Sequence, residues 1–313
     1  MPLTYTPRKR FSPQEYAQAI LAGDRIMLSR AITLIESKLP SDVALAEKVL
    51  EIILPHTGNS LRVGITGVPG VGKSTFIESF GKLITGMGKK LAVLTIDPSS
   101  QRSKGSILGD KTRMESLAND PMAYIRPSAS GATLGGVNNK TRETMLLCEA
   151  AGYEVILIET VGVGQSETTV AEIADFFLLL MLAGAGDELQ GIKKGIMEMA
   201  DALVITKADG DNVTMSQMAA REYANAMRLF PAQDSGWEPE VLTCSSVEQR
   251  GLDAVWDVIV RHHELMCQTG YFQAKRMEQN IAWMNEIIDY YLKYDFLHAP
   301  AVSEVLDFTQ HQV

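Results

Sequence analysis

One short segment of the sequence has the residue types and the spacing that bind phosphate groups. The pattern G-x-x-x-x-G-K-[ST] is matched by eight consecutive residues, Gly67, Val68, Pro69, Gly70, Val71, Gly72, Lys73 and Ser74. In this pattern the glycines let backbone N–H groups turn toward phosphate oxygens, and the following helix adds a favourable dipole. We predict that Lys73 reaches the β- and γ-phosphates of a nucleotide, that Ser74 binds Mg²⁺, and that Thr75 also binds the nucleotide.

Two acidic residues come directly after apolar runs that have the length of strands. Asp97 follows residues 91–96, and Glu159 follows residues 155–158. Both should therefore lie near the phosphate loop, and Mg²⁺ beside a nucleotide needs few protein ligands of this kind. Glu159 also begins the segment Glu-Thr-Val-Gly, which resembles the D-x-x-G element of GTPases. There the N–H of the glycine, here Gly162, senses the γ-phosphate.

A third motif is typical of proteins that bind guanine. Lys207 and Asp209 match the sequence N-K-x-D, with Thr206 in place of the usual Asn. A carboxylate at Asp209 can accept hydrogen bonds from guanine N1–H and the exocyclic amine, whereas adenine has an acceptor at N1. The Lys207 stem can cover the base, but the Thr206 hydroxyl cannot reproduce both contacts of an amide. A second loop near the base is predicted after the next strand, at Cys244, Ser245 and Ser246.

These motifs need a sheet to position them. We predict seven strands, at residues 62–66, 91–96, 123–126, 154–159, 176–182, 202–206 and 240–243, and helices between several of them, at residues 74–85, 140–150, 192–199 and 214–229. Alternating strands and helices indicate an α/β fold with a mainly parallel sheet covered by helices on both faces. Ligands of such sheets bind at the carboxyl ends of the strands, where all three motifs lie.

Helical patterns flank this region on both sides, so we predict an N-terminal helical extension at residues 1–59, a nucleotide-binding domain at 60–263 and a helical tail at 264–313. Ser12 begins a helix as its cap, with Pro13 at the first position and Glu15 three residues on. Pro40 should end the first helical stretch, and Ser41 should cap the next. The amphipathic tail has an aromatic face, which favours a contact between two copies of the chain.

Composition excludes several other classes of protein. The chain has 313 residues, is 46% apolar and has a net charge of −9, which argues against nucleic-acid binding. Its longest apolar run is too short for a membrane helix, and its N-terminus has no apolar stretch typical of a signal peptide. The three cysteines show no C-x-x-C spacing, which indicates a reducing compartment, so we expect a cytoplasmic protein without a disulfide framework.

Longer segments resemble one particular family, the methylmalonyl-CoA mutase-associated GTPase chaperones of the MeaB/ArgK group, which also includes the MMAA-type proteins. The resemblance covers nearly the whole chain. It is carried by GVPGVGKST from Gly67, DPSSQRSKGSILGDKTRM from Asp97, TLGGVNNKTRE from Thr133, ETVGVGQSE from Glu159 and GAGDELQGIKKGIMEMADALVITKAD from Gly184.

The resemblance implies a homodimer that binds Mg²⁺ and GTP or GDP and hydrolyses GTP. Hydrolysis would control the delivery of adenosylcobalamin to an acyl-CoA mutase of the methylmalonyl-CoA mutase type and protect that mutase. The adenosylcobalamin belongs to the partner, and a cobalamin adenosyltransferase is a second candidate partner. The resemblance assigns Asp97, Asp110 and Glu159 to the metal region and suggests a role for Lys193 in stimulated hydrolysis. The sequence departs from the family at Thr206 and at Ala183, where a proline is expected.

Two other functions stay open from the residues alone. A nickel-enzyme metallochaperone GTPase would be expected to carry a His-rich tract or paired cysteines, but the five histidines are scattered apart from His262-His263. A kinase of a transport protein would need a base that activates its acceptor, and none is evident. Because no arginine finger is evident either, we expect slow hydrolysis by the protein alone and acceleration by a partner.

Overall fold

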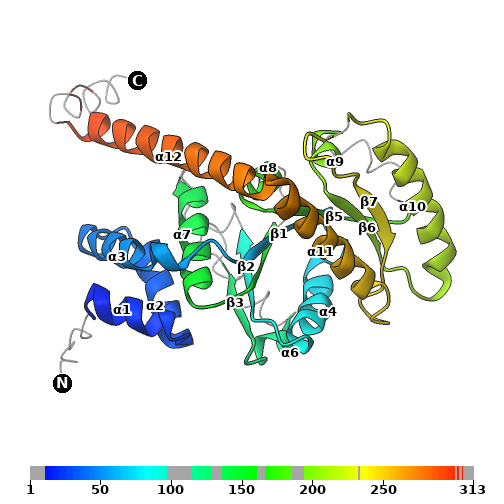
Figure 1. Ribbon diagram of the computed structural model, residues 1–313, viewed down its shortest axis with the longest axis horizontal. Coiled ribbons are helices and arrows are strands. Elements are labelled where there is room, and N and C mark those ends of the chain that lie inside the picture. The colour runs from blue at the N-terminus through cyan, green and yellow to red at the C-terminus, as the bar shows by residue number, and fades with distance from the viewer. Residues whose placement is uncertain are drawn as a thin grey trace.

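The computed structural model describes residues 11–96, 114–127, 136–160, 166–184, 194–231, 233–299, 302 and 305. Its centre is a parallel sheet of seven strands in the order β3-β2-β4-β1-β5-β6-β7 (Figure 1). The strands are β1 (Leu61–Gly67), β2 (Leu91–Ile96), β3 (Ala123–Pro127), β4 (Val155–Thr160), β5 (Phe176–Leu182), β6 (Ala202–Thr206) and β7 (Glu240–Thr243). All seven predicted strands are confirmed, and the α/β class with them.

Helices cover both faces of this sheet because its central strands are apolar on both sides. On one face lie α4 (Lys73–Gly86), α6 (Glu115–Ala118) and α11 (Leu252–Thr269). On the other lie α7 (Gly136–Ala150), α8 (Ser166–Ile173), α9 (Lys194–Glu198) and α10 (Val213–Met227). Within β2, Val93 faces the first layer, whereas Leu94 faces the second. This burial on both faces is typical of parallel sheets.

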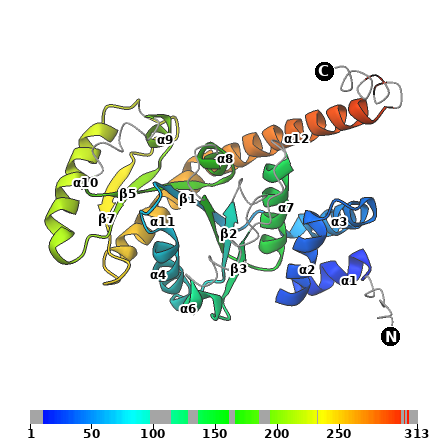
Figure 2. The same ribbon diagram turned by 180° about the vertical axis from the view of Figure 1, so that it is seen from behind.

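Three N-terminal helices form an outer layer beyond α7 (Figure 2). They are α1 (Pro13–Leu21), α2 (Arg25–Glu36) and α3 (Pro40–Ile53), followed by the short 3₁₀ helix η1 (Leu54–His56). The predicted start of α1 is confirmed. The Ser12 hydroxyl accepts a hydrogen bond from the Glu15 N–H at 3.2 Å, and the Glu15 carboxylate accepts one from the Ser12 N–H at 2.7 Å. Such a capping box satisfies two N–H groups that the helix itself leaves unpaired.

The prediction for Pro40 and Ser41 was wrong. Helix α2 already ends at Glu36, and Pro40 is the first residue of α3 rather than the end of a helix. Leu39 occupies the cap position, without a side-chain hydrogen bond to the helix. The reason is that proline fits the first turn of a helix as readily as it ends one, since the first N–H groups have no partner within the helix.

The C-terminal region is also divided differently from the prediction. Helix α11 continues to Thr269, past the predicted boundary at Glu264, and a second helix, α12 (Tyr271–His298), follows directly. The break is at Gly270, whose φ of 77° lies in the left-handed region that glycine adopts without steric cost. Figure 1 shows α12 crossing the molecule and projecting beyond it toward the C-terminus, so we call α12 the arm.

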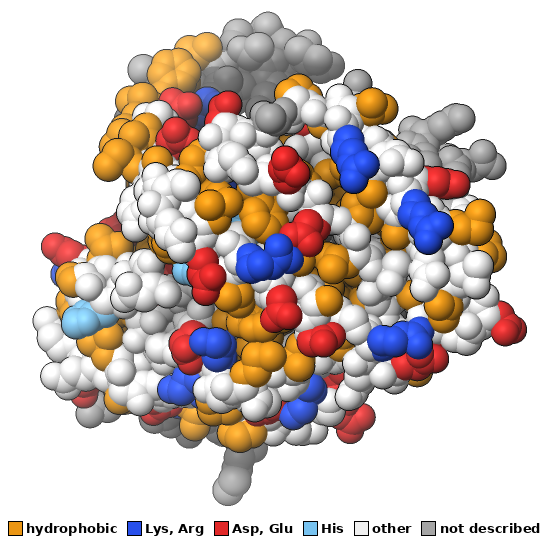
Figure 3. All heavy atoms as spheres, turned by 45° about the vertical axis from the view of Figure 1, so that its right-hand side comes forward, with side chains coloured by type: hydrophobic (Ala, Val, Ile, Leu, Met, Phe, Trp, Pro, Cys, Tyr) orange, Lys and Arg blue, Asp and Glu red, His pale blue; other side chains and the backbone are white. Residues whose placement is uncertain are grey.

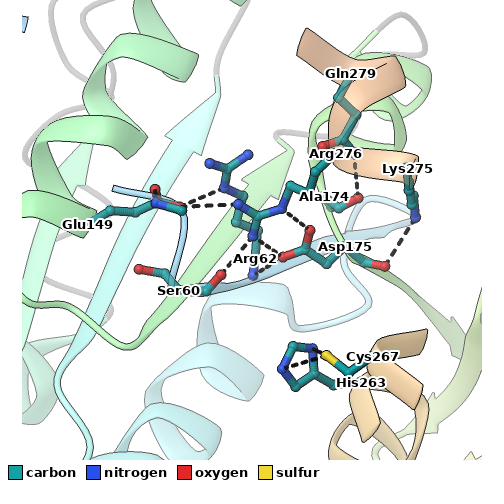
Figure 4. Close-up of polar contacts among 11 residues, drawn as sticks. Ser60, Arg62, Glu149, Ala174, Asp175, His263, Cys267, Lys275, Arg276 and Gln279 are labelled. Atoms are coloured by element: carbon teal, nitrogen blue, oxygen red, sulfur yellow. Dashed lines mark hydrogen bonds and ion pairs between the residues drawn. The ribbon is translucent and has the colours of Figure 1, made fainter. Parts of the chain in front are cut away.

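A buried network of charges fastens the first turns of the arm to the sheet (Figure 4). The Arg276 guanidinium donates to both oxygens of Asp175, at 2.6 and 2.7 Å, and to the Ser60 carbonyl at 2.7 Å. Glu149 of α7 pairs with Arg62 at 2.8 Å and lies 3.7 Å from Arg276. Asp175 precedes β5, so the arm is fixed at the amino-terminal edge of the sheet, opposite to the carboxyl ends of the strands.

Among the described helices, none combines the length and the apolar character needed to cross a bilayer. On the face shown in Figure 3, Lys and Arg side chains are interspersed with Asp and Glu side chains and do not gather in one patch.

Candidate nucleotide-binding site

The phosphate loop lies between the central strand β1 and helix α4, as the sequence predicts. Strand β1 ends at Gly67, and α4 begins at Lys73. Gly67 packs so closely against β5 that a Cβ atom there would lie 2.4 Å from the Leu180 carbonyl oxygen. No other residue can occupy this position without displacing backbone. Since β4 and β5 flank β1 on either side, the loop lies at the centre of the carboxyl edge of the sheet.

Lys73 is buried at the start of α4, and its ammonium group lies inside the loop. Its Nζ donates to the carbonyls of Gly67 at 2.8 Å and Val68 at 3.4 Å. Burial lowers the pKa of Lys73, and the nearby carboxylates of Glu159 and Glu167 act in the opposite direction. The sequence did not single out Glu167, which lies in α8. Its only signal was its place at the end of the ETVGVGQSE segment, which begins at Glu159.

Ser74 and Glu159, both predicted near the metal, lie together. The Ser74 hydroxyl donates to the Glu159 carboxylate at 3.3 Å, and Glu159 is almost fully buried at the end of β4. Behind them, Thr66 and Thr160 are joined through their hydroxyls at 2.9 Å across β1 and β4. One hydroxyl and one carboxylate suit Mg²⁺, which keeps several waters and takes its other ligands from phosphates. These residues therefore fit the ion.

Several predicted site residues lie outside the described parts of the chain. They are Asp97, Asp110, Gly162 and Lys193. Among the described residues no cluster of three or more His, Cys, Asp and Glu side chains could hold a metal. Ser74 and Glu159 are thus the described part of the predicted metal site. Thr75, the residue after Ser74, is exposed in the first turn of α4.

The predicted base-reading turn, residues 206–209, lies against the phosphate loop. It follows β6 and leads into the 3₁₀ helix η3 (Gly210–Asn212). The Thr206 hydroxyl donates to the Val71 carbonyl at 2.7 Å, and the Lys207 ammonium donates to the Gly70 carbonyl at 2.8 Å. Lys207 has a φ of 56°, which is uncommon for a residue with a side chain. The turn and the loop are therefore one connected unit.

Asp209 is held in place by the second predicted loop. The Ser245 hydroxyl donates to the Asp209 carboxylate at 2.7 Å and accepts a bond from the Glu248 N–H at 3.0 Å. The Cys244 side chain is buried in the core, where burial raises the pKa of its thiol to about 12. Its backbone also pairs within the protein, since the Cys244 N–H donates to the Ile205 carbonyl at 2.9 Å and the Cys244 carbonyl accepts from the Ala208 N–H at 3.0 Å. The Ser246 carbonyl accepts a hydrogen bond from Ser79 of α4 at 2.9 Å.

A parallel sheet with a phosphate loop after its central strand, an acidic residue at the end of the neighbouring strand and a K-x-D turn beside the loop defines the class of P-loop GTPases. Within that class, the chain belongs to the MeaB family. The family model described as methylmalonyl Co-A mutase-associated GTPase MeaB matches residues 28–301.

Similar proteins come from bacteria and animals. The chain is 52% identical over 287 residues to a putative GTPase of Caulobacter vibrioides, covering 92% of this chain and 88% of the relative. It is 48% identical over 272 residues to the GTPase ArgK of Escherichia coli, covering 87% and 82%. Identity to the mitochondrial methylmalonic aciduria type A homolog of Mus musculus is 43% over 315 residues, covering 97% and 76%.

A solved structure shares the fold along almost the whole chain. It is described as the crystal structure of LAO/AO transport system kinase and superimposes with a TM-score of 0.79 at 37% identity. The match covers 98% of this chain and 95% of that one. The sheet and the helices before and after it are thus shared with that structure.

Proposed function

We propose that this protein is a Mg²⁺-dependent guanine-nucleotide switch that controls the loading of adenosylcobalamin into an acyl-CoA mutase of the methylmalonyl-CoA mutase type and protects that mutase. The main support is that the phosphate loop, the Ser74–Glu159 pair and the Asp209 turn converge at one edge of the sheet. The association with the mutase rests on the family description. A cobalamin adenosyltransferase is a further candidate partner, and the cytoplasm is the proposed location.

In the proposed reaction, water attacks the γ-phosphorus of GTP, the bond to the oxygen that bridges the β- and γ-phosphates breaks, and GDP and phosphate are released. The Lys73 ammonium moves from the carbonyls of Gly67 and Val68 to the β- and γ-phosphate oxygens, where it stabilises the charge that develops. Backbone N–H groups of the loop add to this effect. Ser74 and Glu159, together with Asp97 and Asp110, would hold Mg²⁺, which would neutralise charge on the same phosphates. Gly162 would report the presence of the γ-phosphate, and Lys193 would contribute when a partner is bound.

Each of the three predicted regions would have a separate role. Residues 60–263 would bind and hydrolyse the nucleotide, residues 1–59 would cover the outer face of α7, and residues 264–313 would join two copies of the chain. The support for the last point is the arm, whose exposed face carries apolar side chains at helical spacing, Met277, Ile281, Met284, Ile288 and Leu292.

The choice of guanine can be tested at Asp209. The Asp209→Asn variant should bind GDP on the order of a hundredfold more weakly, because two hydrogen bonds to a charged acceptor are lost. It should gain affinity for XDP, whose base carries an oxygen where guanine has its amine. Isothermal titration with GDP, XDP and ADP measures this. Asp211→Asn, at an exposed neighbour, is the matched control and should bind like the wild type. Equal affinity of the wild type for ADP and GDP would contradict a guanine switch.

The role toward a mutase needs a second experiment. Phosphate release from GTP should be slow for the protein alone and at least about tenfold faster with the adenosylcobalamin-dependent mutase of the same organism, since a partner can supply the missing transition-state contacts. The Lys73→Ala variant should abolish release in both conditions. Pull-downs with GTP and then GDP loaded would show whether binding depends on the nucleotide. Phosphate transferred to a protein acceptor instead of water would favour the kinase alternative.

A further inference from the structure

Thr206 has only one proton to donate, and the structure shows where that proton is used. The Thr206 Oγ1 atom lies 2.7 Å from the Val71 carbonyl oxygen and 3.3 Å from the Met181 carbonyl oxygen. Both neighbours are acceptors, so the hydroxyl must donate, and it can donate to only one acceptor at a time. The shorter contact, to the phosphate loop, is the better hydrogen bond. Thr206 is buried, with 3% of its surface exposed.

This hydrogen bond fixes a peptide group of the phosphate loop. The Val71 carbonyl and the Gly72 N–H belong to one planar peptide and point in opposite directions. A carbonyl held by Thr206 therefore fixes the direction of that N–H. Lys207, the next residue of the turn, holds the Gly70 carbonyl at 2.8 Å. Consecutive residues of the base-reading turn thus brace consecutive peptides of the loop that surrounds the phosphates.

We propose that Thr206 is a positioning residue that braces the phosphate loop and gives no hydrogen bond to the purine. This inference rests on the proposed function, because it assumes a guanine nucleotide. Asp209 would contact the Watson–Crick edge of the base. Thr206 lies at the start of the same turn, on the side of the phosphate loop, where the five-membered ring with its acceptor N7 would face it. An amide at position 206 has two N–H donors and could serve both Val71 and N7, whereas the hydroxyl serves Val71 alone.

As a consequence, this chain would recognise guanine through its Watson–Crick edge alone. Selectivity against adenine would depend on Asp209, which Ser245 holds at 2.7 Å, and not on N7, which both purines share. Replacing Thr206 by Asn should therefore tighten binding of purine nucleotides in general, without changing the preference for guanine over adenine.

The decisive probe is 7-deaza-GDP, which has a carbon in place of N7. The wild type should bind GDP and 7-deaza-GDP with equal affinity, within about twofold. The Thr206→Asn variant should prefer GDP by about fivefold, which corresponds to one net hydrogen bond. Isothermal titration of both proteins with both nucleotides measures the two ratios. A wild-type preference of fivefold or more for GDP would overturn the proposal, and so would a Thr206→Asn variant that shows no preference.

The brace itself is tested by Thr206→Val, which keeps the shape but removes the hydroxyl, with Thr206→Ser as the control that restores it. Thr206→Val should bind GDP, IDP and 7-deaza-GDP all on the order of tenfold more weakly, because the buried Val71 carbonyl loses its donor. Thr206→Ser should stay within about twofold of the wild type. Loss confined to GDP, or equal affinities for Val and Ser variants that melt like the wild type, would overturn the brace.

Failure of the proposed function gives a different result from failure of this inference. A wild type that binds GDP no better than ADP refutes the guanine switch on which this inference rests. A wild type that prefers GDP to ADP but also requires N7 refutes only the inference about Thr206.

Discussion

At the scale of single residues, the proposed nucleotide contacts are held in place by hydrogen bonds within the protein. Asp209 is oriented by Ser245, and the phosphate loop is held by Thr206 and Lys207. A side chain whose position is fixed before the ligand arrives loses little entropy on binding. We therefore expect these supporting hydrogen bonds to contribute to affinity.

His262 is a buried residue far from the proposed chemistry, and it gives a prediction about pH. It lies edge-on to the rings of Phe176 and Trp237, with ring centroids 5.0 and 5.1 Å away. Burial lowers the pKa of His262 to about 3. In the unfolded chain the pKa of histidine is near 6.5. Below that pH the unfolded state binds a proton that the folded state excludes, so stability is complete above pH 6.5 and falls as the pH decreases.

We therefore expect the free energy of unfolding to fall by about 2 kcal/mol when the pH is lowered from 7 to 5, because of His262. The His262→Phe variant should lack this part of the pH dependence, whatever its stability at pH 7. Denaturant titrations of both proteins at the two pH values measure the difference. An unchanged slope in His262→Phe would show that His262 does not titrate in this range.

At the scale of elements, the arm is joined to the sheet by ionic contacts from several segments. Arg276 of the arm meets Asp175, which precedes β5, and Glu149 at the end of α7. Asp175 also accepts the Arg62 N–H of β1 at 2.8 Å, and Gln279 donates to the Ala174 carbonyl at 3.0 Å. Buried charges of this kind are costly when one partner is lost, because the other stays desolvated.

The Arg276→Met variant should lower the free energy of unfolding by about 3–5 kcal/mol, since Asp175 and Glu149 would keep buried negative charge. Arg261→Met removes an exposed ion pair with Glu240, whose atoms are 2.7 Å apart, and should cost less than about 1 kcal/mol. Chemical denaturation of both variants and the wild type gives the comparison. Similar small losses in the two variants would mean that the Arg276 contacts add little to stability.

At the scale of the whole molecule, the candidate nucleotide site and the residues that fix the arm to the sheet lie at opposite edges of that sheet. The site is formed after the carboxyl ends of β1, β4 and β6, whereas Ser60, Arg62 and Asp175 lie at the amino-terminal edge. The face of the arm that carries Met284 and Ile288 points away from the body, opposite to the buried Gln279. A row of exposed apolar side chains of this length is typical of a protein interface.

We expect the double variant Met284→Glu and Ile288→Glu to be monomeric, because it would bury two unpaired charges in the proposed contact between two arms. The wild type should be a dimer. Light scattering coupled to size-exclusion chromatography measures the mass of each. Lys293→Glu, which changes an exposed residue on another side of the same helix, should remain dimeric. A monomeric wild type would refute the proposed dimer, and a dimeric double variant would place the interface elsewhere.

Much of this protein could be predicted from the sequence because the decisive signals are local. A buried parallel strand needs a continuous apolar run, and a phosphate loop needs glycine, lysine and serine at fixed spacing. All seven strands, the helix after Gly72 and the capping box at Ser12 follow from such patterns. Pro40 was misread because proline is compatible with both the end and the start of a helix. The break at Gly270 was missed because the apolar periodicity continues on both sides of it.

The tertiary structure alone decided which side chains meet across long separations in sequence. Residue types told us that Thr206 departs from the usual motif, but only the fold shows that its hydroxyl is used on Val71, 135 positions away. The same holds for the pairing of Asp209 with Ser245 and of Arg276 with Asp175. Hydrogen bonds need donor and acceptor within about 3 Å, and no local pattern contains that distance. The sequence by itself determined the class of site, and the turns after β6 and β7, which the sheet brings beside the phosphate loop, determined how that site is supported.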